Sequence, residues 1–305
     1  MKISTYRELE YKSELLPLMN QAFHLPFNLK AFERIVEIDL RVKSGPVGFC
    51  AIEDEHLVGF VGVLDLPTRN LDGDMEHIGG ICGVATLPGY MRKGICTALM
   101  NAAHEYFKQK NYSFSFLSTV PTSMAYNLYK AMDYKDLTEF PSAYKTIQNG
   151  DIKILEKTRK RLNFEKILEI YTEYSKAKTG FVIRDKEYLN TLMRVEGLNA
   201  KDCMIEEQGY VINKKDKNGT RIKEIVALSA KCLKRLVQKV ENNTRTAVYD
   251  KAVMDNKVLQ IYRARKYMLL SRSNAVAMIK PLTAAVSFKQ TYGDKFYVGG
   301  LDVGC

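Results

Sequence analysis

The chain has 305 residues, of which 46% are hydrophobic and 27% are charged. This balance is that of a globular protein and excludes a disordered or fibrous chain, and the length favours two domains. The sequence contains no run of about 18 apolar residues, and its first residues lack the apolar core of a signal peptide. We therefore expect a cytoplasmic protein with no membrane segment.

The net charge of +11 is unevenly distributed along the chain. Residues 1–150 contain 15 Lys and Arg against 17 Asp and Glu, which leaves 31 against 18 for the remainder. A basic excess can indicate nucleic acid, a membrane surface or an anionic ligand. Here the basic residues are spread along helical stretches rather than gathered in one tract, so we expect solvated helix faces and no nucleic-acid or membrane partner.

The cysteines give no sign of a disulfide framework or a metal site. The six are Cys50, Cys82, Cys96, Cys203, Cys232 and Cys305, and no two form a Cys-x-x-Cys pair. Three of them lie in apolar runs, where cysteine behaves as a small hydrophobe. We therefore expect no metal.

The first half of the chain mixes helical and strand patterns. Apolar residues at helical spacing predict helices over residues 11–24 and 30–43. Two β-rich runs around an acidic turn at 53–55, followed by a glycine-rich run at 77–87, predict a meander of three strands. A helix over 95–110, a strand over 113–120, a short helix over 122–134 and an extended segment near 138–147 complete this unit.

From about residue 149 the pattern restarts as a weaker echo of the first half. It predicts a long charged helix to 178, a helix over 185–195, strands over 203–215 and 221–230 around a turn at 216–219, a helix over 231–240 and a helix-like piece from 273. No low-complexity linker separates the halves, so we expect them to pack together. The predicted domains are residues 1–148 and 149–282, followed by a C-terminal segment over 283–305.

The link between the third strand and the helix over 95–110 has the form of an anion-binding turn. Gly94 lies immediately before the helix, after the basic pair Arg92 and Lys93. The first N–H groups of a helix are unpaired and its dipole is positive there, so this end attracts anions. Gly94 permits close approach of a pyrophosphate to the backbone, and the basic pair adds charge.

The segment GGICGVATLPGYMRKGICTALM resembles the acetyl-CoA motif of GNAT acetyltransferases. Gly94 matches the central glycine of that motif and Cys96 its second small residue, whereas Met91 stands where Gln or Arg is usual. The resemblance implies an α/β (α+β) GNAT fold with a central mixed, mostly antiparallel sheet flanked by helices. It also implies acetyl-CoA as cosubstrate, held by Val84, Ala85, Thr86, Met91, Arg92, Lys93, Gly94, Ile95, Cys96 and Thr97.

A second segment, TSMAYNLYKAMDY, is similar to the Asn-x-x-Ala-x-x-Leu-Tyr-x-x-x-Gly-Phe segment of the same family. The match falls on Ala125, Leu128 and Tyr129, and it implies that Tyr129 is the general acid. The departing thiolate of CoA needs a proton, and a phenol with a pKa of about 10 still carries one at neutral pH. A core tyrosine whose hydroxyl bonds to the backbone is the alternative.

An amine acceptor must lose a proton before it attacks, so a general base is needed. The nearby supply is Glu53, Asp54, Glu55, Asp74, Glu76 and His77. We favour Glu76, because it lies at the start of the predicted cofactor strand.

The whole chain is similar to the tandem acetyltransferases of the enhanced-intracellular-survival (Eis) type, which carry a second, degenerate GNAT-like unit. KEIVALSAKCLKRLVQK has a strand and a helix but no glycine turn between them, so we expect no CoA in the second unit. That family also has a sterol-carrier-like third domain, which we expect to be absent or reduced to residues 283–305. The family's terminal carboxylate serves as a base, which implies a catalytic role for Cys305. A frayed tail is the alternative.

Together these features predict an N-acetyltransferase that moves an acetyl group from acetyl-CoA to an amine. The acceptor classes left open are polyamines, aminoglycoside-like compounds and lysine amines, and a homo-oligomer is compatible with the sequence. The alternative is a non-catalytic protein on the same scaffold that senses acyl-CoA or binds nucleic acid.

Overall fold

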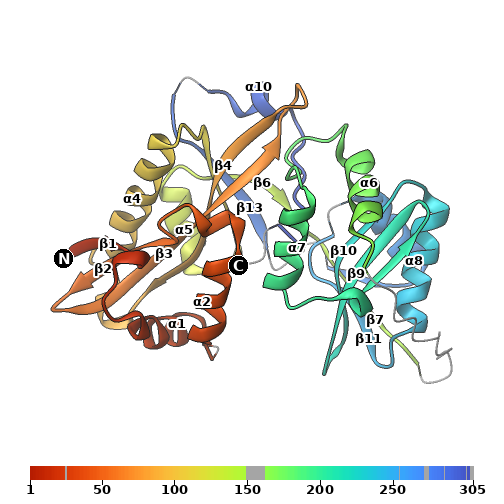
Figure 1. Cartoon of the computed structure of the whole chain (residues 1–305), viewed down its shortest axis with the longest axis horizontal. Coiled ribbons are helices and arrows are strands. Elements are labelled where there is room, and N and C mark those ends of the chain that lie inside the picture. Colours follow the sequence, from red (N-terminus) through yellow and green to blue (C-terminus); the bar gives the residue numbers. More distant parts are fainter. Residues whose placement is uncertain are drawn as a thin grey trace.

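The structure is a computed structural model that describes residues 1–24, 26–148, 162–253, 255–270, 275–284, 286–299 and 301–302. Its described strands form one seven-stranded and one six-stranded sheet, side by side in Figure 1. We call each sheet with its helices a unit. The first sheet has the order β1 (Lys2–Thr5), β2 (Gly48–Glu53), β3 (His56–Arg69), β4 (Met75–Thr86), β5 (Phe114–Thr119), β13 (Val276–Pro281) and β6 (Lys135–Glu139).

Helices cover both faces of the first sheet. One face packs against α4 (Ile95–Gln109) and α5 (Met124–Ala131) in a core that includes Val61, Ile81 and Leu117. The other face packs against α1 (Leu15–Phe23) and α10 (Phe288–Tyr292) through residues such as Leu18, Phe60 and Tyr292. On this second side, α2 (Leu29–Ile38) and α3 (Leu40–Lys43) follow α1.

The second sheet has the same layered arrangement. Its order is β12 (Met268–Leu270), β7 (Ser142–Thr146), β11 (Ala247–Asp250), β10 (Gly219–Ala227), β9 (Gly209–Asp216) and β8 (Cys203–Glu206). One face carries α8 (Ala230–Asn242) and α9 (Asn256–Ala264), and the other carries α6 (Phe164–Ser175) and α7 (Lys186–Val195). In each unit the single parallel pair, β4–β5 or β10–β11, is joined through one helix, so the two units repeat one topology.

The two sheets exchange a strand. β7 follows β6 in sequence but lies in the second sheet, and β13 returns from the end of the chain to lie between β5 and β6. Its pairing with β5 runs from Val276 opposite Thr119 to Pro281 opposite Phe114. Figure 1 shows blue β13 among the strands of the first unit and yellow-green β7 among those of the second. A single cut near residue 148 does not separate the sheets, and the domain boundaries stay a prediction.

Most of the predicted elements are present. The opening helices, the meander β2–β4 and the turn between β9 and β10 are confirmed. Of the long charged helix predicted from 149, α6 covers Phe164–Ser175, and residues 149–161 lie outside the described residues. The helix-like piece from 273 is wrong, because Val276–Pro281 is strand β13. Val276 to Ile279 is an apolar run buried on both faces, and so short a run has no periodicity that separates strand from helix.

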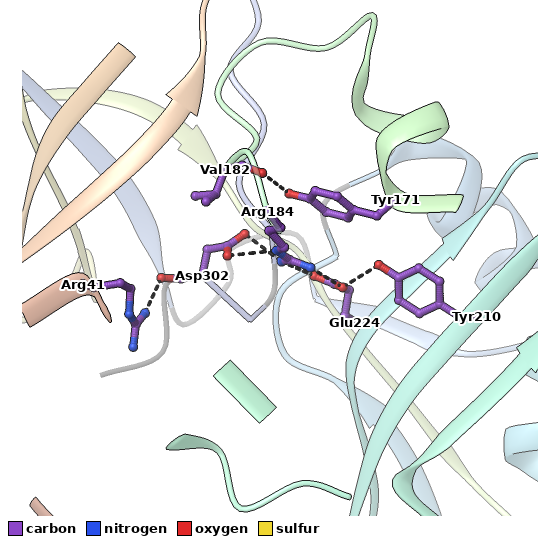
Figure 2. Close-up of polar contacts among 7 residues, drawn as sticks. All are labelled: Arg41, Tyr171, Val182, Arg184, Tyr210, Glu224 and Asp302. Carbon is purple, nitrogen blue, oxygen red and sulfur yellow. Dashed lines mark hydrogen bonds and ion pairs between the residues drawn. The ribbon is translucent and has the colours of Figure 1, made fainter. Parts of the chain in front are cut away.

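The two units meet around a buried arginine, shown in Figure 2. Arg184 donates to Glu224 at 2.9 and 2.7 Å and to Asp302 at 3.1 and 2.7 Å. Its guanidinium carbon also lies 4.1 Å from the centre of the Tyr171 ring. The Arg184 side chain is 0% exposed, and the carboxylates are 5% and 1% exposed. We call Arg184, Glu224 and Asp302 the Arg184 cluster.

The cluster also fixes the end of the chain to the first unit. Arg41 on α3 donates to the backbone oxygen of Asp302 at 2.8 Å and pairs with Asp39 at 2.7 Å. Leu301 and Asp302 are each 1% exposed. The alternative of a frayed tail is therefore wrong up to residue 302, and Cys305 lies outside the described residues.

Replacing Arg184 with methionine is expected to destabilise the protein by about 3–5 kcal/mol, because it leaves two buried carboxylates without their cation. Burial already raises the pKa of the Asp302 carboxyl, even beside Arg184. Urea unfolding of Arg184→Met measures the change. Lys186→Met is the matched control, since Lys186 pairs with Glu165 at the exposed surface and should have little effect. Equal stability of the two variants would contradict the prediction.

Candidate active site

The first sheet opens where β4 and β5 part. These parallel strands pair only at Gly79 with Ser115 and at Gly80 with Phe116. β4 continues to Thr86, with its other edge still paired to β3. Val84, Ala85 and Thr86 therefore lie on a stretch of β4 that has no strand neighbour on the β5 side among the described residues. Backbone groups on that side are available to an extended ligand.

A bulge in β4 lies beside this opening. Gly62 of β3 faces Cys82 and Phe60 faces Ala85, so the register shifts between these two pairs. Gly83, within the bulge, has a φ of +57°, a conformation that glycine adopts without strain. The bulge turns the local backbone away from regular pairing at the point where the two strands separate.

The predicted anion-binding turn follows the end of β4. Met91, Arg92, Lys93 and Gly94 are exposed, and φ is +61° at Arg92 and +79° at Gly94. A Cβ atom built on Gly94 has no neighbour within 4 Å, so the space beside this residue is open. Of the following residues, Ile95 is buried, Cys96 is half-buried and Thr97 is exposed.

The start of α4 has no cap. Six other helices begin with a side chain that accepts from the first turn: Asn28, Ser123, Asn163, Asp185, Ser229 and Asp255. No side chain does this at Gly94. Among the described residues none accepts from the backbone N–H groups of residues 92–97. With Arg92 and Lys93 alongside, these donors suit a phosphate or pyrophosphate.

Tyr129 on α5 reaches the same opening. Its side chain is 5% exposed, and burial raises the pKa of the phenol, with further contributions from the Cys96 and Cys82 thiols. Both thiols are therefore close to it, one from the first turn of α4 and one from the β4 bulge. The Tyr129 hydroxyl has no hydrogen-bond partner among the described residues. A buried, protonated and unbonded phenol is available as a proton donor.

The neighbouring Tyr134 shows what a structural tyrosine looks like here. Its ring lies 5.9 Å from that of Tyr129, but its hydroxyl bonds to His104 Nε2 at 2.8 Å and to Ser115 Oγ at 2.6 Å. Burial lowers the pKa of His104 to about 4, so this network is neutral. Tyr134 is therefore part of the core.

Glu76 does not come near Tyr129. It lies at the far end of β4, where its backbone oxygen accepts from Thr68. Seven residues separate it from Gly83, which is roughly 23 Å along a strand. The acidic turn at 53–55 joins β2 to β3 and is likewise not part of the opening. No group of three His, Cys, Asp or Glu in the described part of the chain is arranged to hold a metal.

The second unit lacks the equivalent site. β10 and β11 also part, after Ile222 and Asp250, but the returning C-terminal segment lies in that gap. A cavity of about 40 Å³ remains, lined in part by Glu224, Val298 and Gly299, which is room for about one water. The start of α8 is also capped, because Ser229 Oγ accepts from the Cys232 N–H at 3.3 Å. Neither open space nor free donors are left for an anion.

A larger cleft of about 1070 Å³ lies between β7 and the end of α8. It is far from the β4–β5 opening, and its cations Lys145 and Arg265 are both paired with the buried Glu241. Because these charges already neutralise one another, we assign no chemistry to this cleft.

The sequence predicted the turn, the strand end and Tyr129, but not the Arg184 cluster or its contact with Arg41. Its members come from residues up to 261 positions apart, and no local pattern connects them. The buried arginine leaves one trace in the sequence, Gly180 to Arg184, which had no assigned role there.

Comparisons with known proteins agree with this geometry. Residues 13–134 match the model of the acetyltransferase (GNAT) family. No curated protein matches the sequence of the chain. No helix among the described residues has the length and apolar composition needed to cross a membrane.

Three solved structures are similar to the whole chain. A GCN5-related N-acetyltransferase from Kribbella flavida has a TM-score of 0.66 and 16% identity over 92% of this chain and 72% of that one. For Eis1 from Mycobacterium abscessus the values are 0.59 and 14% over 92% and 74%. For a GCN5-related N-acetyltransferase from Sphaerobacter thermophilus they are 0.57 and 12% over 91% and 95%. Residues 13–134 are thus a domain of the acetyltransferase (GNAT) family, and the two-sheet fold of the whole chain resembles that of Eis-type tandem acetyltransferases.

Proposed function

We propose that the chain is an N-acetyltransferase that uses acetyl-CoA as cosubstrate and an amine as acceptor. One observation carries the proposal: an uncapped helix start opens beside a buried tyrosine, where two parallel strands part. Family membership supplies the acyltransferase chemistry, and the first unit has room and donors for the pyrophosphate. A cytoplasmic location, as expected from the sequence, is part of the proposal.

In the proposed complex the pyrophosphate meets the N–H groups of residues 92–97, assisted by Arg92 and Lys93. The pantetheine arm follows the free edge of Val84 to Thr86 and brings the thioester to the β4 bulge. The nitrogen lone pair of the amine attacks the carbonyl carbon, the C–N bond forms and the C–S bond breaks. Tyr129 protonates the departing thiolate.

The amine must lose its proton to a base before it attacks. Glu76 could take part only through a chain of waters, because of its distance along β4. We therefore propose the terminal carboxylate of Cys305, three residues after Asp302, as the base. The anchoring of Asp302 between Arg184 and Arg41 supports this choice, because it holds the chain end beside the first unit.

Changing Gly94 to aspartate should abolish acetyl-CoA binding, since it places a side chain and a negative charge where the pyrophosphate would meet backbone N–H groups. Isothermal titration calorimetry with acetyl-CoA measures the loss. Gly197→Asp is the control, because Gly197 also has a positive φ, +64°, but lies in the turn after α7. Wild-type affinity in Gly94→Asp would remove this turn from the cofactor site.

Changing Tyr129 to phenylalanine should lower kcat about ten-fold or more and leave acetyl-CoA affinity nearly constant, as expected for a lost general acid. Steady-state kinetics and calorimetry together test this. Tyr126→Phe on the same helix is the control, since its hydroxyl bonds only to Asp136 at the surface. If Tyr129→Phe turns over at the wild-type rate, Tyr129 is a packing residue.

Deleting residues 303–305 should lower turnover about ten-fold or more and leave acetyl-CoA affinity and the melting temperature unchanged, because Asp302 and its ion pair remain. Deleting 301–305 should in addition lower the melting temperature, because it removes a partner of Arg184. A chain that lacks 303–305 and retains full activity would show that the terminus is not the base.

A further inference from the structure

The face of the first sheet opposite α4 carries an aromatic cluster beside the proposed reaction centre. Tyr6, Phe27, Phe32 and Phe60 form what we call the aromatic wall. Ring centres lie 5.3 Å apart for Tyr6 and Phe32, 5.4 Å for Phe27 and Phe32, and 6.5 Å for Phe32 and Phe60. Tyr6 and Phe60 are buried, whereas Phe27 and Phe32 are half-buried. The wall therefore keeps part of its aromatic surface open.

The wall begins at the β4 bulge. A Cβ atom on Gly83 would lie 3.4 Å from the Phe60 ring and 3.6 Å from Met19 of α1. Tyr129 belongs to the core on the α4 face of the sheet, and the wall belongs to the core on the opposite face. An amine that attacks a thioester at the bulge while Tyr129 serves the leaving sulfur must approach from the side of the wall.

Helix α2 supplies the open part of the wall. Its apolar residues Phe32, Ile35 and Val36 share one side at helical spacing, yet no residue of α2 is buried. A surface of this kind gains stability when an apolar body covers it, at about 25 cal/mol per Å² of apolar area. The wall is continuous with the proposed reaction centre through Phe60, so the acceptor itself is the occupant that fits.

The charges near the wall do not suit a polycation. One carboxylate, Glu33, is close enough to the Tyr6 phenol to raise its pKa, which burial and Glu33 together bring to about 12. Lys12 Nζ lies 5.3 Å from the centre of the Tyr6 ring and offsets that charge. Each ammonium group of a spermidine or an aminoglycoside would need a carboxylate of its own.

We propose that the acceptor is a primary arylalkylamine, whose ring packs on the aromatic wall while its nitrogen reaches the thioester at the bulge. This inference rests on the proposed function. The new amide bond forms at that nitrogen, the thioester C–S bond breaks, and the nitrogen's proton passes to the base while Tyr129 protonates the sulfur.

Acetylation rates at saturating acetyl-CoA test this assignment with 2-phenylethylamine, spermidine and kanamycin as acceptors. We expect kcat/KM for 2-phenylethylamine to exceed both others by at least ten-fold. A higher value for spermidine or kanamycin overturns the acceptor class and leaves the proposed function standing. Acetyl-CoA binding without turnover of any of the three overturns both.

Variants of Phe32 locate the ring. Phe32→Ala should raise KM for 2-phenylethylamine about ten-fold and leave acetyl-CoA affinity unchanged, and Phe32→Leu should restore part of the loss. The control is Arg34→Ala on the exposed side of the same helix. Thermal melting of each variant shows whether it folds, and Phe32→Leu keeps the test valid if Phe32→Ala does not. An unchanged KM in a folded Phe32 variant overturns binding at the wall.

Discussion

The ion pairs of Arg184 hold this molecule together, because a fully buried guanidinium is stable only while both of its carboxylates are present. Glu224 belongs to the second sheet and Asp302 to the end of the chain, and Arg41 of the first unit binds the backbone of Asp302. The cluster therefore requires the chain end to lie between the two units. Everything proposed about the terminus depends on this constraint.

The same constraint explains why two units of one topology differ in chemistry. In the second unit the C-terminal segment fills the gap between β10 and β11, and Ser229 caps the helix that follows. In the first unit the gap is open and Gly94 leaves the N–H groups of α4 without partners. Identical strand order thus gives one potential anion site and one structural joint. Occupied space and a single capping residue decide between them.

The exchange of β7 and β13 joins the fates of the two units. Met278 and Ala277 of β13 are 0% exposed within the first sheet, although they are encoded near the end of the chain, and Ala143 of β7 is 0% exposed within the second. Neither sheet can complete its hydrogen bonding without the other half of the sequence. The distance between the candidate site and the Arg184 cluster is consequently fixed by strand pairing rather than by a linker.

Local pattern in the sequence determined the strand, glycine turn and helix around Gly94 and the position of Tyr129 on α5, because periodicity and turn chemistry act over a few residues. It did not determine that Val276–Pro281 is a strand, since a short apolar run suits helix and strand alike until partners flank it. The burial of Asp302, the distance of Glu76 and the filled second cleft were decided only by tertiary structure. They depend on contacts between residues more than a hundred positions apart, which no local pattern encodes.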